Sequence, residues 1–267
     1  MKNILFVASE CVPFVKTGGL ADVVGSLPKY FNKKEYDVRV MIPKYACIPQ
    51  EWKDKMQYKT HFYMDLAWRS QYVGILEMEY EGVHFYFIDN EFYFAGFHPY
   101  GNIFEDIEKF AFFCKAALSA MPSLDFRPDI IHCHDWQTGL IPVYIKDSFN
   151  DNPFYHGIKT IMTIHNLKFQ GIWDKQKVID ITGLNEYYFT SDKLDAEIDR
   201  STAKDAEHDT LIKGLRVDVN ANKSAIDSEV ARSTARDEAH DAAIAKNASD
   251  ITTEVNRAKA EEAKIRQ

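Results

Sequence analysis

Short apolar runs recur through the first 194 residues, and each one ends in polar or turn-forming residues. They occupy residues 4–8, 38–42, 130–132 and 161–164. Continuous apolar runs of this length predict strands that are buried on both faces of a parallel sheet. Residues 104–121 carry apolar side chains at helical spacing and predict a crossover helix. The pattern therefore predicts parallel strands that are connected by helices.

Between residues 56 and 89 the pattern changes to alternating apolar and polar positions. Residues 72–80 and 83–88 alternate in this way, and Glu81 and Gly82 separate them. Alternation across a two-residue connection is typical of an antiparallel hairpin. We expect this hairpin to lie at the edge of the parallel sheet.

A different pattern begins at residue 195. The last 73 residues contain 15 alanines but no aromatic residue and no proline, so they cannot form a globular core of ordinary density. Their apolar positions step by three and four residues, and residues 196–209 recur as residues 228–241. Such spacing, with small and polar seam positions, predicts an α-helical coiled-coil stalk. We therefore expect two domains, residues 1–194 and 195–267.

Two histidines, His208 and His240, occupy equivalent positions in this repeat. Metal binding and pH sensing are two possible roles for such a pair. A solvated or seam residue that was copied by duplication explains the pair more simply, and we favour that interpretation.

The charge and the cysteine content limit the classes of binding partner and the cellular compartment that we expect. The formal net charge of −8 divides evenly between the two parts, and no basic patch points to nucleic acid. The first apolar run, of five residues, is too short for a signal-peptide core or a membrane span. The four cysteines are widely spaced, as is typical of reduced thiols. We expect a cytoplasmic protein that binds neither nucleic acid nor membrane.

A glycine loop follows the first predicted strand and leads into a helical pattern. Gly18 and Gly19 remove Cβ atoms where this helix begins, so backbone N–H groups can approach an anionic ligand. Lys16 adds a full positive charge beside them. A tight turn with a solvated lysine is the plain alternative for these three residues.

Polar residues follow two further apolar runs. The strand at residues 130–132 leads into His134 and Asp135, and the run at 161–164 is a buried strand that leads into His165 and Asn166. Because ligands of open α/β sheets bind outside the carboxyl ends of the strands, these four side chains are candidate site residues. A metal at the His-x-His pair is disfavoured, since no further ligands follow at a recognised spacing. Thr138 is a candidate cap for the next helix.

Three segments of the chain carry a family resemblance. Residues 8–23, with the Lys-Thr-Gly-Gly loop, residues 132–140, with His-x-His-Asp-Trp, and residues 159–171, with Ile-His-Asn, resemble bacterial glycogen synthases and plant starch synthases. This resemblance implies an open parallel Rossmann-like sheet, the first half of a two-domain glycosyltransferase fold. It also implies retaining transfer of glucose from ADP-glucose to α-1,4-glucan, without a metal or a cofactor.

The same resemblance implies roles for individual residues. Lys16, Gly18 and Gly19 would lie against the sugar-nucleotide donor, and His165 would lie beside the transferred glucose. The remaining expected site residues are the catalytic Asp135 and the sugar-binding Tyr93, His134 and Asn166. For Tyr93, an aromatic side chain packed on the core is an equal alternative.

The resemblance stops near residue 194, and the tail resembles the repetitive trimeric stalks of phage tail fibres and adhesins. We therefore expect a truncated glucosyltransferase that is inactive alone, because the second donor-binding domain is missing. One alternative is an α-glucan- or nucleotide-binding module on an oligomeric, trimeric stalk. Another is a chimeric reading frame without a selected function.

Overall fold

The computed structural model describes residues 1–189 and 191–265, with their side chains except those of residues 103–104, 191–209, 211–213, 215–216 and 265. The chain divides into two compact units, Met1–Thr190 and Ser191–Gln267. The first unit is a mixed α/β structure, and the second contains one long helix.

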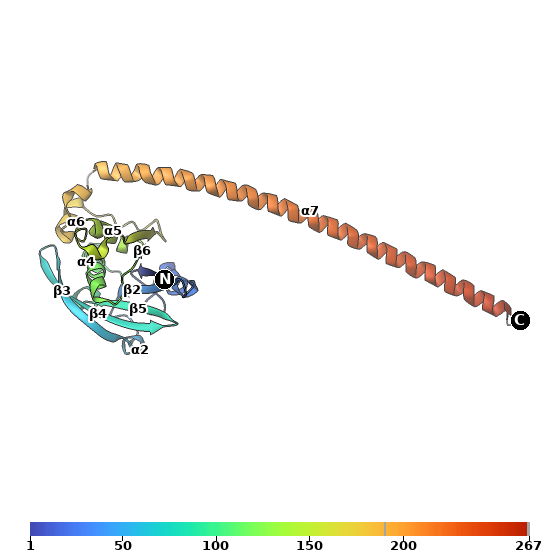
Figure 1. The fold of residues 1–267 in the computed structure, drawn as a ribbon, viewed down its shortest axis with the longest axis horizontal. Helices are drawn as coiled ribbons and strands as arrows, with labels where there is room; N and C mark the ends of the chain where they lie inside the picture. The colour runs from blue at the N-terminus through green and yellow to red at the C-terminus, as the bar shows by residue number, and fades with distance from the viewer. Residues whose placement is uncertain (190, 266–267) are drawn as a thin grey trace. The chain divides into compact units, whose positions relative to one another are not determined.

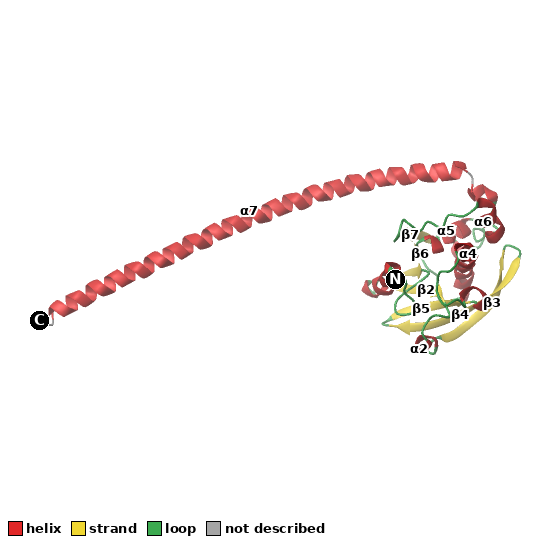
Figure 2. Cartoon of the chain, turned by 180° about the vertical axis from the view of Figure 1, so that it is seen from behind, coloured by secondary structure: helices red, strands yellow, loops and turns green. Residues whose placement is uncertain are grey.

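A seven-stranded sheet runs through the first unit in the order β3-β4-β5-β2-β1-β6-β7 (Figures 1 and 2). Five strands pair in parallel, namely β1 (Lys2–Val7), β2 (Tyr36–Pro43), β5 (Val83–Asp89), β6 (Ile130–His134) and β7 (Lys159–Thr163). β4 (Arg69–Tyr80) pairs antiparallel with both β5 and the outer strand β3 (Gln57–Leu66). The predicted mostly parallel sheet is confirmed.

The strand order changes direction at β1. The chain first moves from β1 through β2 to one side of the sheet, and it later returns to place β6 on the other side of β1. In open α/β sheets, ligands bind outside the carboxyl ends of the strands at such a switch point. The switch point here lies between the loop that follows β1 and the loop that follows β6.

The antiparallel hairpin is present but is larger than predicted. Tyr80 pairs with Val83 across the expected turn, but β5 also pairs in parallel with β2 and is buried within the sheet. The outermost strand of this edge is β3, which the sequence analysis did not delimit. The alternation over residues 83–88 was misleading, because Phe85, Tyr86 and Phe87 are all almost fully buried.

Helices fill the connections between the strands. The longest one in the first unit, α4 (Ile103–Ala120), confirms the predicted crossover helix, and its Cys114 is fully buried. The other helices are α1 (Gly19–Ser26), α2 (Gln50–Lys53), α3 (Glu91–Phe94), α5 (Leu140–Lys146) and α6 (Lys175–Thr182), with short 3-10 helices η1 (Leu27–Tyr30), η2 (Met121–Ser123), η3 (Trp136–Thr138), η4 (Pro153–Tyr155) and η5 (Glu186–Phe189).

An aromatic cluster anchors the loop after β1 to the sheet. The ring of Phe14, which is 2% exposed, meets Phe85 and Phe87 edge to face at 5.0 Å between centroids and Trp52 at 5.5 Å. Edge-to-face pairs of this kind add about 0.5–1.5 kcal/mol each beyond the burial of their area. The cluster therefore fixes the base from which the glycine loop rises.

Two expectations about the chain after β6 are wrong. The run at residues 161–164 was expected to be buried, but Ile161 and Met162 of β7 are 47% and 40% exposed. β7 is the last strand of the sheet, and the described elements leave both of its faces partly open. Thr138 does not cap α5, because its hydroxyl donates backward to the carbonyl oxygens of His134 and Asp135.

The second unit contains α7 (Ser191–Ile265), an uninterrupted helix of 75 residues. Its apolar side chains are exposed at Val219, Ile226, Val230, Ile244 and Ile251, among others. The predicted helix is confirmed. A coiled coil needs a second helix, so the coiled coil stays a prediction. His240 is exposed, and the side chain of His208 lies outside the described residues.

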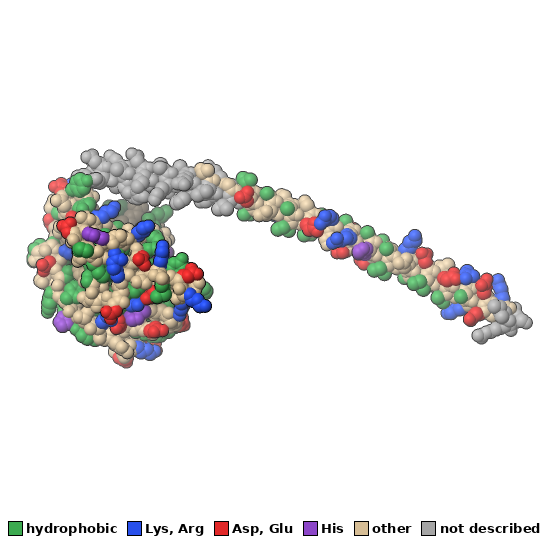
Figure 3. Space-filling model, in the orientation of Figure 1, with side chains coloured by type: hydrophobic (Ala, Val, Ile, Leu, Met, Phe, Trp, Pro, Cys, Tyr) green, Lys and Arg blue, Asp and Glu red, His purple; other side chains and the backbone are tan. Residues whose placement is uncertain are grey.

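Acidic and basic side chains are intermixed on the face of the first unit that Figure 3 shows. Within the described residues, none of the helices combines the length and the apolar character that crossing a membrane would require.

The packing of α1 predicts unequal effects of alanine at two of its glycines. A Cβ atom on Gly25 would overlap the side chain of Val12 and lie 2.5 Å from its carbonyl oxygen, whereas one on Gly19 would meet nothing within 4 Å. We expect Gly25→Ala to lower the free energy of unfolding by about 1–3 kcal/mol, and Gly19→Ala to leave it unchanged or raise it. Urea unfolding followed by tryptophan fluorescence measures this, because all four tryptophans lie in the first unit. Equal stability of the two variants would contradict the packing described here.

Candidate functional site

The candidate site lies at the carboxyl ends of β1 and β6, on either side of the switch point. β1 delivers the loop that contains Lys16, Gly18 and Gly19, and β6 delivers His134 and Asp135. The neighbouring strand β7 delivers His165 and Asn166 to the same edge. The parallel pairing of β1 with β6, and of β6 with β7, therefore brings seven of the eight predicted residues to adjacent strand ends and loops.

The glycine loop is held from below by buried polar groups. Glu10 is 3% exposed, and its carboxylate accepts the backbone N–H of Thr17. Next to it, the hydroxyl groups of Ser9 and Tyr100 lie 2.7 Å apart. Burial raises the pKa of the Tyr100 hydroxyl, and the nearby Glu10 carboxylate raises it further, so the hydroxyl stays protonated. Sequence reasoning missed both supports: Glu10 stands inside the recognised segment, whereas nothing in the sequence marked Tyr100.

Gly18 and Gly19 leave open space at the start of α1. Added Cβ atoms would come no closer than 3.8 Å to the Glu10 carboxylate at Gly18, and would meet nothing within 4 Å at Gly19. Gly18, the residue before the helix, has an extended backbone with φ of −151°, which any residue adopts. The fold therefore does not require glycine at either position. The open space faces the positive end of a helix, where an anion is stabilised.

Lys16 stands beside this space with its ammonium group available. Its Nζ atom lies 2.7 Å from Oδ1 of Asp22, and both side chains are about half exposed, at 53% and 51%. An exposed ion pair of this kind is worth about 0–1 kcal/mol. An incoming anion can therefore displace Asp22 at small cost.

Asp135 connects the ends of β6 and β7. Its backbone N–H donates to the carbonyl oxygen of Thr163 at 2.9 Å, and its Oδ1 accepts the backbone N–H of His165 at 2.6 Å. Its φ of 57° and ψ of 179° form a conformation that residues other than glycine rarely adopt. Strain of this kind costs about 1–3 kcal/mol and gathers at functional sites. The carboxylate is thus fixed by two strands at once.

Three histidines lie together behind Asp135. Nδ1 of His134 and Nε2 of His165 are 2.9 Å apart, and Nε2 of His132 is 2.7 Å from the hydroxyl of Thr163. Burial, together with the neighbouring His132 and His165, lowers the pKa of His134 to about 3. Burial and the nearby His165 also lower the pKa of His132. Both rings are therefore neutral near pH 7. His134 is fully buried, whereas His165, in the loop after β7, is half-buried.

The remaining predicted residues are engaged in different ways. Tyr93 in α3 donates its hydroxyl to Glu108 at 2.8 Å and stacks on Phe112 at 4.5 Å between centroids, so it packs on the core as the alternative interpretation expected. It follows β5, on the far side of β2 from β1. Asn166 is exposed, and its Oδ1 closes a turn with the N–H of Lys168 at 3.0 Å.

Trp136, next to Asp135 in the chain, packs against other aromatic rings. Its ring meets Phe110 edge to face at 5.2 Å and lies 4.7 Å from Trp173. Both of these tryptophans crowd Gly171, where an added Cβ would come within 2.9 Å of Trp136. The site thus combines N–H donors and a cation on one side with a carboxylate, an imidazole and aromatic rings on the other. This arrangement suits a ligand that carries both phosphate and sugar.

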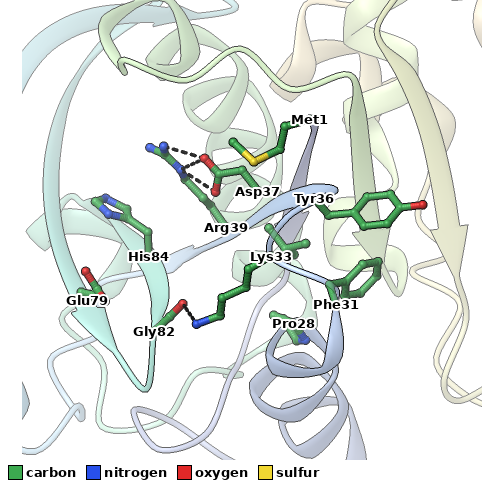
Figure 4. Close-up of a pocket in the computed structure, with 11 residues that line it drawn as sticks. Met1, Pro28, Phe31, Lys33, Tyr36, Asp37, Arg39, Glu79, Gly82 and His84 are labelled. Atoms are coloured by element: carbon green, nitrogen blue, oxygen red, sulfur yellow. Dashed lines mark hydrogen bonds and ion pairs between the residues drawn. The ribbon is translucent and has the colours of Figure 1, made fainter.

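A pocket of about 260 Å³ lies elsewhere, at the amino ends of β1, β2 and β5 (Figure 4). Two of its charged groups are already engaged: Arg39 pairs with Asp37 at 2.8 Å, and Lys33 donates to the carbonyl oxygen of Gly82 at 3.0 Å. It contains none of the predicted site residues. In the described part of the chain, no group of three or more His, Cys, Asp or Glu side chains is arranged to hold a metal ion.

Similar proteins were found at the level of sequence and of structure. The glycogen synthase of Lachnoclostridium phytofermentans is 70% identical over 204 residues, and that of Lachnospira eligens is 72% identical over the same length; each match covers 76% of this chain and 43% of the relative. The catalytic domain of Starch Synthase IV from Arabidopsis thaliana, bound to ADP and acarbose, superposes with a TM-score of 0.60 at 28% identity, covering 70% of this chain and 38% of that one.

The chain spans less than half the length of the curated glycogen synthases that it matches. The model of the starch synthase catalytic domain matches residues 3–225 and thus extends past residue 194 into α7. Because this match covers more than half of the chain, the chain belongs to the family of starch synthase catalytic domains.

Proposed function

We propose that the first unit forms the N-terminal side of a retaining glucosyltransferase site, which takes glucose from ADP-glucose and extends α-1,4-glucan. The observation that carries this proposal is the open space over Gly18 and Gly19, at a helix start and beside Lys16. A fold that does not itself need these glycines leaves room there for a phosphate group. The starch synthase structure that was solved with ADP and acarbose supports the same ligand classes.

On the donor side, the diphosphate would lie on the backbone N–H groups of Gly18 and Gly19. Lys16 would turn from Asp22 to a phosphate oxygen, because its exposed ion pair holds it only weakly. The macrodipole of α1 adds about 0.3–1 kcal/mol to such binding.

On the sugar side, we assign the catalytic roles to His165 and Asp135. His165 would hydrogen-bond the transferred glucose, where charge develops in the transition state. Asp135 would hold His165 in place through its bond to the backbone N–H. Asn166 is exposed at the same edge and available to sugar hydroxyl groups, and Tyr93 would offer only the part of its ring that Phe112 leaves uncovered. The buried His134 would act on the sugar through His165.

The apolar pattern of α7 supports a second role, as an oligomeric stalk, which is compatible with the first. The exposed apolar residues of α7 form a stripe. It contains two pairs four residues apart, Ile226 with Val230 and Ile251 with Val255. Val219 lies seven residues before Ile226, and Ile244 lies fourteen residues after Val230, as in a heptad pattern. We propose that this stripe associates with copies of the same helix, as a trimer, and displays the first unit as a glucan- or nucleotide-binding module. We further propose a cytoplasmic location, with which the four free thiols agree.

ADP binding tests the donor side. We expect ADP to bind the 267-residue chain weakly, with a Kd of about 1 mM, and the double variant Gly18→Ala, Gly19→Ala to bind at least about tenfold more weakly, because the methyl groups occupy the phosphate position. Titration calorimetry or NMR shift titration measures this. A second variant, Lys16→Ala, should also bind ADP more weakly than the parent chain. Lys33→Ala, at the amino ends of the strands, is its matched control. The donor assignment fails if the glycine variant keeps its thermal melt and binds ADP like the parent chain.

Glucosyl transfer separates binding from catalysis. We expect the 267-residue polypeptide to show no transfer from ADP-glucose to glycogen, because the groups described here stabilise only one side of a transition state. Incorporation of labelled glucose into glycogen measures this. Incorporation that disappears in Lys16→Ala would show instead that this chain is a complete enzyme.

Sedimentation of the full chain tests the stalk. We expect the mass to rise with concentration, since Val and Ile spaced among Ala, Ser and Asn bury too little area for tight association. Ile226→Asp should abolish this rise, whereas Ser228→Asp, on the opposite side of the same helix, should not. A monomeric mass at high concentration would refute the proposed association.

A further inference from the structure

His134 is buried in an unusual way for a residue at the edge of a site. Its side chain is fully buried, its ring stacks on His132 at 4.2 Å between centroids, and it lies 5.2 Å from Phe6. Nδ1 lies 2.9 Å from Nε2 of His165, and the planes of the two rings are nearly parallel, at 15°. Among the described residues, Nε2 of His134 has no hydrogen-bond partner, and no solvent reaches it. One nitrogen of this ring is therefore bonded and the other is not.

This asymmetry identifies the nitrogen that carries the proton. Burial and the two neighbouring histidines lower the pKa of His134 to about 3, so the ring is neutral near pH 7, with one N–H and one lone pair. A buried N–H without an acceptor is rare, because nothing offsets its loss of water. The proton therefore belongs on Nδ1, the nitrogen with a partner, and the lone pair on Nε2 faces the apolar interior.

The neighbouring His132 does not change this assignment. Its own Nε2 is already bonded to the hydroxyl of Thr163 at 2.7 Å. Its ring lies against the ring of His134 with only 30° between the planes, so it contacts the face of that ring, where no lone pair is available. The reverse arrangement, with the proton on Nε2 of His134, would leave that N–H without a partner.

We propose that His134 is a positioning residue that donates Nδ1–H to His165 and thereby holds His165 with its own proton on Nδ1. Because Nε2 of His165 must then accept this bond, the proton of the His165 ring lies on Nδ1, which becomes a fixed donor. No described residue bonds to that nitrogen, and the bond from the His165 backbone N–H to Asp135, at 2.6 Å, holds the backbone of His165 in place. The inference rests on the proposed function for the nature of the ligand. It specifies that His165 recognises an oxygen that accepts a hydrogen bond, namely a hydroxyl oxygen of the donor glucose.

The tautomer of His165 tests the proposal without any ligand. In the full chain labelled with ¹⁵N, long-range ¹H–¹⁵N spectra distinguish a protonated from an unprotonated ring nitrogen, and His165→Gln identifies the signals of His165. We expect the parent chain to carry the His165 proton on Nδ1. A proton on Nε2 of His165 would overturn the proposal whatever the variants do.

Three variants test whether His134 is the cause. His134→Phe keeps a flat ring but has no donor, so His165 should change to a mixture in which the Nε2–H form prevails. His134→Asn places an amide N–H near the former Nδ1 and should keep the original tautomer. His132→Phe, which removes a stacked neighbour but not the bond, should also keep it. An unchanged tautomer in His134→Phe would overturn the proposal.

Binding of ADP and ADP-glucose to the same proteins shows the consequence for recognition. We expect His134→Phe to weaken ADP-glucose binding by about three- to tenfold, the value of one hydrogen bond, and to leave ADP binding unchanged, whereas His134→Asn should restore both. Equal weakening of both ligands would indicate a general structural effect and would overturn the positioning role. If the parent chain binds neither ligand, the proposed function fails, and the tautomer measurement still decides the role of His134.

Discussion

The pairing of β1 between two parallel neighbours is the constraint on which the site depends. Leu5, Phe6 and Val7 are fully buried, so β1 cannot shift its register without exposing them. β1 pairs with β2 on one side and with β6 on the other, in the registers Val7 to Met41 and Val7 to Cys133. The glycine loop and the Asp135 turn therefore leave the sheet at the same level. Two segments more than 100 residues apart in the chain become the two sides of one site.

The polar groups that leave this edge are satisfied mainly by one another. Glu10 accepts the N–H of Thr17, and Asp135 accepts the N–H of His165, so each carboxylate holds the backbone of a loop that a strand alone could not position. Charge-assisted bonds to backbone N–H groups are roughly twice as strong as neutral ones. Both loops are therefore preorganised before any ligand arrives, which is the condition for recognition at low entropic cost.

The sequence predicted four of the five parallel strands correctly, because they follow from local pattern: apolar runs make strands, and the polar residues after them lie at the carboxyl ends. It could not predict burial that depends on neighbours. Ile161 and Met162 have the composition of a buried strand, yet they are exposed because β7 is the last strand of the sheet. Similarly, His134 and His165 each follow an apolar run, and only the fold shows that one is fully buried and the other half exposed. Nothing in the sequence around Asp135 indicated that its φ would be positive.

Two features of the site destabilise the fold, and both lie next to buried core side chains that offset them. The strained backbone of Asp135 costs about 1–3 kcal/mol, and the unpartnered nitrogen of His134 costs a further 1–3 kcal/mol or so. Directly beneath lie Phe6 and Phe110, which are 0% and 2% exposed, and each such side chain contributes about 1.5–3 kcal/mol on burial. Two aromatic side chains thus roughly balance the two costs. Phe6 contacts His134, and Phe110 contacts Trp136, so these two buried side chains stabilise both sides of the Asp135 turn.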